Sequence, residues 1–350
     1  MKIGFDAKRY FNNSTGLGNY ARWLVDGLAQ RNAYEYHLYQ PNEISQTVNL
    51  PVHSPIGISK ASPSLWRSRF VCSRLEADGI DIFHGLSNEI PFGIHKTNIK
   101  AVVTIHDLIN KRYPQNYRSI DKIIYNRKLH YAQKHATKII TPSEQTKADL
   151  IHYCGTDENK VDVIPLSVQP RKHAEHTNQV EGPYMLCVSG FSKRKNIPTL
   201  IKSYLGLYTN VKLVLAGQKG DTYKEVKALA KHNPNIIIKT NVSNAELDSL
   251  YQHSLFCVYP SLFEGFGIPI LEAFSYGKTV ATSNLSSMPE VGGYAALYFN
   301  PLDVDEITKT LRLMLQQDNR AGLESLIISR LSHFDSEKLL ARYEALYQSL

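Results

Sequence analysis

The stretch EGFGIPILEAFSYG, residues 264–277, decides how the chain is interpreted. It is predicted to be a glycine-bearing loop that leads directly into a helix, with Pro269 at the first helical position and Gly277 just past the end. The first turn of a helix presents backbone N–H groups that have no intrahelical partner. Gly265 and Gly267 allow a ligand to approach that backbone closely, so the stretch predicts an anion site.

Two carboxylates bracket this loop. Glu264 precedes it, and Glu272 lies about a turn inside the helix, while the apolar run at residues 255–259 supplies the strand before it. A phosphate at the helix start would leave both carboxylates facing the neutral, hydroxyl-rich part of the ligand. Sugar nucleotides combine a phosphate with such hydroxyls.

Short apolar runs alternate with helical patterns along the whole chain. Alternation of this kind, with continuous apolar strands, is typical of parallel sheets covered by helices on both faces. Strands are predicted at residues 3–5, 36–39, 80–83, 101–105, 138–141, 161–164, 184–188, 213–216, 236–238, 255–259 and 280–282. Helices are predicted at residues 18–31, 64–77, 118–136 and 143–153, and a capping box of Ser243 and Glu246 begins another.

The chain of 350 residues fits two domains of about 150 to 180 residues. The polar stretch at residues 170–183 is the predicted joint, which gives one domain at 1–169, expected to face an acceptor, and another at 170–334, expected to bind the sugar nucleotide if the loop at Glu264 does so. An amphipathic helix at 335–350 is expected to cross back onto the first domain. Ligands of such folds lie at the carboxyl ends of the strands, so we expect the site in a cleft between the two halves.

Composition points to a soluble globular protein, with 43% hydrophobic and 21% charged residues. No apolar run reaches the roughly 18 residues that span a bilayer, and the first residues lack the apolar core of a secretory signal. The expected location is the cytoplasm. No D-x-D sequence or histidine-rich set indicates a metal, and none is predicted.

The excess of positive charge lies in the first half, where residues 1–170 hold 21 basic and 15 acidic side chains. Residues 111–138 are basic and tyrosine-rich, and Asp121 is their only acid. Such a stretch can rest on the inner face of an anionic membrane or on the phosphate of an acceptor. The alternative is a solvated helix face. No recognition motif accompanies the charge, so nucleic acid is not an expected partner.

Two sites in the first half follow predicted strands. Gly16 and Gly18 form a tight turn that enters a helix, as a dinucleotide-binding loop also does. No acid at the end of the second strand is placed to hold a ribose, which argues against a dehydrogenase. His106 ends a strand and is suited to hydrogen bond a substrate hydroxyl or phosphate, although a histidine that satisfies a loop carbonyl is an equal alternative.

Three consecutive cations, at residues 193–195, precede a helix predicted to start near Pro198. They would repel one another unless a negative group lay among them, and a diphosphate supplies that charge. The alternative is a solvated basic loop. Together with the loop at Glu264, Arg194 and Lys195 complete a predicted diphosphate site.

Taken in order, these sites resemble the retaining glycosyltransferases of family 4, which have the GT-B fold of two facing Rossmann-like, doubly wound domains. The resemblance covers almost the whole chain and is carried by SLFEGFGIPILEAFSYGKTVATSNLSSMPEVGG at 261–293, STGLGNYARWL at 14–24, TIHDLINKRYP at 104–114 and ITPSEQTKADLI at 140–151. Glu264 and Glu272 match the E-x7-E signature of that family. The pattern is most similar to the mannosyltransferase-type branch that builds O-antigens and capsules.

The resemblance implies a role for each matching residue. Glu272 would accept hydrogen bonds from the ribose, Glu264 would lie beside the transferred sugar, and His106 would hold a sugar hydroxyl. Arg194 and Lys195 would contact the diphosphate, with Gly16 and Gly18 beside it. The backbone near Thr240 and Val242 would contact the base. Sugar hydroxyls and phosphate would be bound by the backbone of Gly265, Phe266, Gly267 and Ile268. Asn284, Ser286 and Ser287 would lie near the nucleotide. Gly190 departs from the pattern, because many relatives have an arginine there.

The implied activity is retaining transfer of a hexose, without metal or cofactor, to a hydroxyl of a glycan or lipid-linked oligosaccharide in polysaccharide synthesis. GDP-mannose is the first expected donor and a UDP-hexose the second. An epimerase or a phosphorylase of the same fold is an alternative, but no setting for a pyridoxal-phosphate lysine is found. A non-catalytic sugar-nucleotide-binding scaffold is a further alternative, and retention of both glutamates with Arg194 and Lys195 argues against it.

Overall fold

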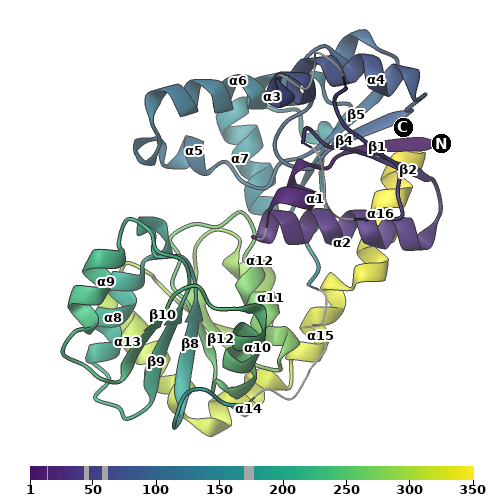
Figure 1. Cartoon of the computed structure of the whole chain (residues 1–350). Helices are drawn as coiled ribbons and strands as arrows, with labels where there is room; N and C mark the ends of the chain where they lie inside the picture. The colour runs from purple at the N-terminus through teal and green to yellow at the C-terminus, as the bar shows by residue number, and fades with distance from the viewer. Residues whose placement is uncertain (14, 43–46, 57–61, 169–176) are drawn as a thin grey trace. The chain divides into compact units, whose positions relative to one another are not determined.

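The computed structural model describes residues 1–13, 15–42, 47–56, 62–168 and 177–350. The chain forms two compact units (Figure 1). Unit 1 comprises Met1–Ser167 and Ser336–Leu350, and unit 2 comprises Val168–Asp335. Part of the polar stretch that was predicted to join the halves, residues 170–176, lies outside the described residues.

Unit 1 contains a parallel sheet of seven strands in the order β3-β2-β1-β4-β5-β6-β7. The strands are β1 (Lys2–Asp6), β2 (Glu35–Tyr39), β3 (Val52–His53), β4 (Ile82–Gly85), β5 (Lys100–Thr104), β6 (Lys138–Thr141) and β7 (Val161–Val163). Its helices are α1 (Lys8–Asn12), α2 (Gly16–Arg31), α3 (Pro63–Leu65), the π-helical turn η2 (Trp66–Phe70), α4 (Val71–Ala77), α5 (Ile109–Arg112), α6 (Ser119–His135), α7 (Glu144–Cys154) and α16 (Ser336–Gln348).

Unit 2 contains a parallel sheet of six strands in the order β10-β9-β8-β11-β12-β13. The strands are β8 (Tyr184–Val188), β9 (Lys212–Ala216), β10 (Ile236–Lys239), β11 (Cys257–Tyr259), β12 (Val280–Ser283) and β13 (Ala296–Phe299). The helices are the 3₁₀ turn η6 (Lys193–Lys195), α8 (Ile197–Leu205), α9 (Tyr223–Ala230), α10 (Asn244–His253), α11 (Ile268–Ser275), α12 (Met288–Gly292), α13 (Val304–Leu315), α14 (Gln317–Glu324) and α15 (Ile327–Leu331).

The prediction of two parallel sheets is confirmed, and the strands lie within two residues of the predicted bounds. The pattern missed β3, which has two residues at the sheet edge, and β13, which follows a glycine-rich turn. It also predicted one helix at 64–77, where the chain forms α3, η2 and α4 in succession. The capping box of Ser243 and Glu246 at the start of α10 is present as predicted. Among the described residues, no helix combines the length and apolar character needed to cross a bilayer.

Helix α16, the last of the chain, packs within unit 1. Trp23 on α2 donates from Nε1 to the hydroxyl of Ser336 at 2.8 Å. His84, a fully buried residue of β4, hydrogen bonds through Nδ1 to the hydroxyl of Tyr347 at 2.7 Å and through Nε2 to that of Thr104 at 2.8 Å. Burial lowers the pKa of His84 to about 3, so this buried ring is neutral at pH 7.

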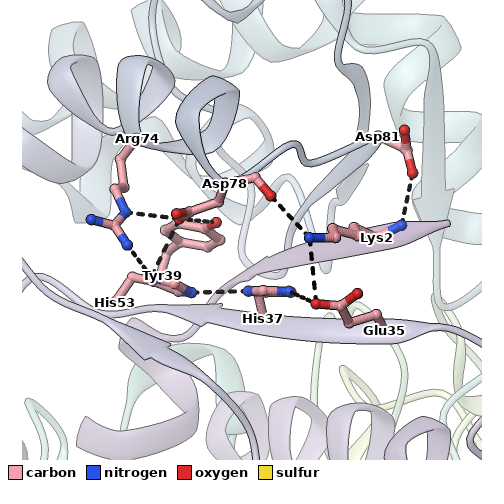
Figure 2. A network of polar contacts seen from close by, with 8 residues as sticks. All are labelled: Lys2, Glu35, His37, Tyr39, His53, Arg74, Asp78 and Asp81. Atoms are coloured by element: carbon pink, nitrogen blue, oxygen red, sulfur yellow. Dashed lines mark hydrogen bonds and ion pairs between the residues drawn. The ribbon is translucent and has the colours of Figure 1, made fainter.

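A polar network fixes the other side of unit 1, where α4 meets β1, β2 and β3 (Figure 2). The carboxylate of Asp78, just past the end of α4, accepts hydrogen bonds from the hydroxyl of Tyr39 and from Nε of Arg74, both at 2.8 Å. Nδ1 of His53 lies 3.3 Å from the same oxygen, and its Nε2 lies 2.9 Å from Nδ1 of His37. Burial is the largest cause that lowers the pKa of His53. The network thus ties the short strand β3 to a helix.

We predict that unit 1 loses stability in mild acid. A buried histidine with a lowered pKa binds no proton while the unfolded chain, with a pKa near 6.5, does, so stability is full above pH 6.5 and falls as pH drops toward 3. His84 alone should reduce the unfolding free energy by about 2 kcal/mol between pH 7.5 and pH 5. Opening free energies from hydrogen exchange, corrected for intrinsic exchange, will measure the change in β4 and α16.

Unit 2 is the internal reference, because its described histidines are not buried. Equal opening free energies for β4 amides at pH 7.5 and pH 5 would contradict a lowered pKa of His84 in the folded protein.

Candidate functional site

The predicted residues of unit 2 gather where the strand order changes direction, between β8 and β11. In doubly wound sheets the loops at the carboxyl ends of such neighbouring strands diverge and leave room for a ligand. The loop after β8 carries η6, and the loop after β11 leads into α11. The backbone N–H of Leu262 donates to the carbonyl of Arg194 at 2.8 Å, so the two loops are joined directly.

A cluster of one carboxylate and two cations lies between these loops. Oε1 of Glu264 accepts from Nη1 of Arg194 at 2.6 Å and lies 2.6 Å from Nζ of Lys195. Nη1 of Arg194 also donates to the carbonyl of Phe263 at 3.1 Å, and Nζ of Lys195 to the hydroxyl of Tyr259 at 2.7 Å. Sequence reasoning assigned both cations to a diphosphate and did not anticipate that they pair with Glu264.

Burial and neighbouring charges shift the pKa values of the groups in this cluster in opposite directions. Burial alone would raise the pKa of the Glu264 carboxyl, but Lys195 and Arg194 lower it to about 2. Burial lowers the pKa of the Lys195 ammonium, against the attraction of Glu264. With all three groups charged, the cluster carries a net charge of one positive unit, which favours an anionic ligand.

Two serines hold the backbone of the loop before α11. The hydroxyl of Ser286 donates to the carbonyl of Glu264 at 2.6 Å, and that of Ser287 lies 2.6 Å from the carbonyl of Phe266. Ser286 has a φ of 59°, a backbone conformation that residues other than glycine rarely adopt. The resemblance implied that these serines lie near the nucleotide. Their visible contacts are with the loop itself.

Helix α11 begins in the way an anion site requires. Gly267 is its N-cap with a φ of 119°, and the helix starts at Ile268. Pro269 therefore occupies the second helical position rather than the predicted first, which still suits a residue without an N–H. Gly265 and Phe266 are buried, as is Gly267, so little of this loop is exposed.

Glu272 lies in α11 and is oriented by two tyrosines. The hydroxyl of Tyr251 donates to its Oε2 at 3.0 Å, and the ring of Tyr251 stacks on that of Tyr276 at 5.3 Å between centroids. The hydroxyl of Tyr276 in turn donates to Asp248 at 2.6 Å. Sequence reasoning missed these tyrosines, although their positions on α10 and just after α11 follow from the predicted helices.

The segment assigned to the base follows β10. Thr240 and Val242 are half-buried, and Asn241 between them has a φ of 58°. This left-handed residue turns the chain before the capping box of α10. The structure thus places both residues at the carboxyl edge of the same sheet as the charged cluster.

Gly190, where the family pattern often has an arginine, lies in the loop after β8. A Cβ added there would meet nothing closer than the carbonyl of Gln218, at 3.8 Å. By contrast, a Cβ at Gly217 would lie 1.9 Å from the carbonyl of Ser189. The close packing of the two loops therefore requires Gly217, while space remains beside Gly190.

His106 of unit 1 lies just past β5 and is buried. Its Nε2 lies 2.9 Å from the carbonyl of Leu86, and its backbone N–H donates to Oδ1 of Asn88 at 2.8 Å. Burial lowers the pKa of the imidazole to about 4, so the ring is neutral at pH 7. Because a carbonyl only accepts, Nε2 carries the proton and Nδ1 is an acceptor. The loop-carbonyl alternative is thus realised, and the ring retains one nitrogen that can accept from a hydroxyl.

The glycine turn of unit 1 lies at the start of α2. Oδ1 of Asn13 accepts from the N–H of Thr15 at 2.9 Å and from that of Gly18 at 3.0 Å. A Cβ at Gly18 would lie 1.8 Å from the carbonyl of Asn13, so the tight turn itself requires this glycine. Gly16 is the first residue of α2 and is half-buried. Tyr20, one turn further, packs edge-on against His106 at 4.8 Å, which brings the turn and the histidine to one edge of the sheet.

A further charged group at this edge was not predicted. Nη2 of Arg67 lies 2.5 Å from Oδ2 of Asp6, the last residue of β1, and 2.5 Å from Oε1 of Glu89. Lys128 completes the chain of charges at 2.5 Å from Oε2 of Glu89. Burial would raise the pKa of Glu89, but Arg67 and Lys128 lower it. The sequence carried one signal that could have found this cluster, because Asp6 follows directly on the strand predicted at residues 3–5.

Two family models match the chain and meet near residue 170. The model described as Glycosyltransferase Family 4 matches residues 14–172, and that described as Glycosyl transferases group 1 matches residues 168–324. Together they include every residue named so far at the candidate site except Asp6 and Asn13.

Several similar curated proteins are named as mannosyltransferases. The chain is 31% identical to O-antigen chain mannosyltransferase B of Escherichia coli over 256 residues, 68% of this chain and 66% of that protein. It is 28% identical to O-antigen chain mannosyltransferase RfbU of Salmonella typhimurium over 204 residues, 57% of each. The match to serotype-specific mannosyltransferase WbdA of Escherichia coli, at 27% identity, spans 68% of this chain and 32% of that protein. The matches thus span less than two thirds of these relatives.

Solved structures share the fold. Sucrose-phosphate synthase from Thermosynechococcus elongatus superposes with a TM-score of 0.79 at 17% identity, over 100% of this chain and 98% of that one. Anabaena HepE in complex with UDP and glucose gives a TM-score of 0.76 at 16% identity over 100% of both chains. The structural likeness shows the GT-B fold, and the two family models show that the chain belongs to the group 1 glycosyltransferases of family 4.

Proposed function

We propose that the chain is a retaining hexosyltransferase that moves mannose from GDP-mannose to a hydroxyl of a glycan or lipid-linked oligosaccharide in cell-surface polysaccharide synthesis. The observation that carries the proposal is the cluster of buried Glu264 with half-buried Arg194 and Lys195 beside the N-terminus of α11. The mannose donor rests on similarity to the O-antigen mannosyltransferases. The proposed place of action is the cytoplasm, at the inner face of the membrane.

Departure of the nucleoside diphosphate is the demanding step, because negative charge grows on the leaving phosphate. The net positive cluster and the N–H groups at the start of α11 would stabilise that charge. Nζ of Lys195 carries three N–H bonds, of which two are used by Glu264 and Tyr259, so one can reach a phosphate oxygen. We propose that these groups, rather than a metal ion, supply the positive charge.

Glu264 would remain a carboxylate throughout the reaction, since its pKa of about 2 lies far below neutral pH. It can accept hydrogen bonds from hydroxyls of the transferred sugar but has no proton to donate. Glu272, oriented by Tyr251, would accept from the ribose hydroxyls. Nδ1 of His106 would accept from a sugar hydroxyl, and the leaving phosphate itself would take the proton of the attacking acceptor.

The remaining donor contacts are proposed as backbone contacts. Phosphate and sugar would be bound by the backbone N–H groups of Gly265, Phe266, Gly267 and Ile268. The base would contact the backbone near Thr240 and Val242. A UDP-hexose donor and a non-catalytic sugar-nucleotide-binding scaffold are the alternatives, and the following experiments separate them.

The donor base is tested by thermal shift with GDP, UDP, dTDP and ADP. We expect GDP to raise the melting temperature most, because binding stabilises the folded state by mass action in proportion to affinity. Incubation with GDP-mannose and a mannose-terminated acceptor should then yield a product longer by one hexose, with EDTA leaving the rate unchanged. A larger shift with UDP would transfer the assignment to a UDP-hexose, and nucleotide binding without product would favour the scaffold.

Replacing Glu264 by Gln should reduce transfer by about 100-fold or more, because a neutral amide accepts from sugar hydroxyls less strongly than a carboxylate and no longer holds Arg194 and Lys195 in place. Gln keeps the size and an acceptor oxygen, and removes only the charge that neutralises one of the two cations. Turnover of Glu264→Gln is compared with that of Glu225→Gln, an exposed position on α9. Circular dichroism and melting temperature report whether unit 2 remains folded, and wild-type turnover in a folded Glu264→Gln protein would remove Glu264 from the site.

Lys195→Ala should weaken binding of the free nucleoside diphosphate by about 10- to 100-fold, since a charge-assisted hydrogen bond is worth about 1.5 to 3 kcal/mol. Lys193→Ala is the matched control. Lys193 belongs to the same turn but is exposed, and we expect its loss to change the affinity less than threefold. Isothermal titration with GDP measures both. Equal affinities for the two variants would contradict a diphosphate site at Lys195.

A further inference from the structure

Four side chains join α10 to α11 of unit 2 and include Glu272. The hydroxyl of Tyr251 on α10 donates to Oε2 of Glu272 at 3.0 Å. The hydroxyl of Tyr276, just past α11, donates to Oδ1 of Asp248 at 2.6 Å. The two tyrosine rings stack with their centroids 5.3 Å apart and their planes 6° from parallel. Each of the two carboxylates is thus held by a phenol hydroxyl, and the two phenols hold each other.

The spacing along the chain brings these side chains together. Asp248 and Tyr251 are three residues apart on α10, so they lie on one face of that helix. Glu272 and Tyr276 are four residues apart at the end of α11, which gives the same result. Figure 1 shows the two helices as neighbours in unit 2. Tyr251 is 1% exposed, so the surrounding protein fixes its ring and the position of its oxygen.

The bond from Tyr251 restricts a side chain that would otherwise be mobile. Glu272 is only half-buried, and a glutamate loses much rotamer freedom when it is ordered. A carboxylate offers about four lone-pair positions, of which the Tyr251 hydroxyl uses one. The bond therefore orients the carboxylate while using a small part of its accepting capacity. A group that is already held in its binding orientation loses less conformational entropy when a ligand arrives.

We propose that Tyr251 is a positioning residue that sets the preference of the site for ribonucleotides over deoxyribonucleotides. It holds the Glu272 carboxylate in the orientation that accepts from the 2′- and 3′-hydroxyls of a ribose. The inference rests on the proposed function, in which Glu272 binds the ribose, and adds the residue that makes this contact selective. Donors built on deoxyribose, such as dTDP-hexoses, lack the 2′-hydroxyl and are the class that the site rejects.

Selectivity follows from holding the carboxylate still. A polar group that is fixed to meet a hydroxyl loses that hydrogen bond when an analogue without the hydroxyl binds, and the analogue is rejected. A mobile carboxylate can turn to water instead, so the penalty for the analogue is smaller. A purely structural role of Tyr251, as a joint between α10 and α11, would change the affinity for both nucleotides alike. The ratio of the two affinities therefore reports whether Glu272 is positioned.

Isothermal titration of the full chain with GDP and with 2′-deoxy-GDP tests the inference, and UDP with 2′-deoxy-UDP covers a uridine donor. We expect the wild type to bind the ribonucleotide about 10-fold or more tighter, since a hydrogen bond to a charged group is worth that much. Tyr251→Phe keeps the ring stack and removes only the hydroxyl. It should reduce the preference to about threefold or less, and change the affinity for the deoxynucleotide by less than about twofold.

The matched control is Tyr204→Phe. Tyr204 on α8 is 2% exposed, and its hydroxyl donates to the carbonyl of Val211, just before β9, at 2.8 Å. Its substitution also deletes one buried phenol hydroxyl of unit 2 and should leave the wild-type preference for the ribonucleotide. Melting temperatures of both variants show whether unit 2 remains folded.

Three results would overturn the inference: no preference in the wild type, a wild-type preference in Tyr251→Phe, or an equal loss in Tyr204→Phe. Glu272→Gln separates the inference from the proposed function on which it rests. If Glu272→Gln keeps the wild-type preference, Glu272 does not bind the ribose, and its proposed role fails together with the inference. If Glu272→Gln abolishes the preference while Tyr251→Phe retains it, the ribose contact stands and only the role of Tyr251 fails.

Discussion

The contact between Glu264 and the two cations of η6 is the constraint on which the site of unit 2 depends. Arg194 and Lys195 lie next to each other in the chain, and both approach one carboxylate oxygen in a largely buried setting. Removing one partner of such a buried group leaves uncompensated charge, which costs far more than an exposed ion pair contributes. The pairing therefore holds the loops after β8 and β11 in a fixed relation even before a ligand binds.

The geometry of parallel sheets explains why residues distant in sequence meet there. In both units the strand order reverses beside the first strand, at β8 and β11 in unit 2 and at β1 and β4 in unit 1. The loops at these points carry Glu264 in one unit, and Asp6 and Glu89 in the other. Each unit thus places a charged cluster at the same topological position, although only the cluster of unit 2 could be recognised as a motif in the sequence.

Patterns with a strong physical cause were predictable from the sequence. Apolar strands, the capping box at Ser243 and the glycine loop at Gly267 depend on local rules, and the structure contains each of them. The partners of charged side chains were not predictable, because they depend on which loops meet in space. The positive φ of Ser286 could not be read either, since serine gives no signal for that conformation.

The two titratable groups assigned to sugar contacts are both locked in one protonation state, and by opposite means. Glu264 stays charged because adjacent cations outweigh its burial, with a pKa of about 2. His106 stays neutral because burial outweighs its one carbonyl contact, with a pKa of about 4. Near pH 7 Glu264 is a carboxylate and His106 a neutral ring, so both are suited to accept hydrogen bonds from hydroxyls and neither to act as a general acid. The proposed reaction needs no general acid or base from either residue, because in its mechanism the leaving phosphate takes the proton of the acceptor.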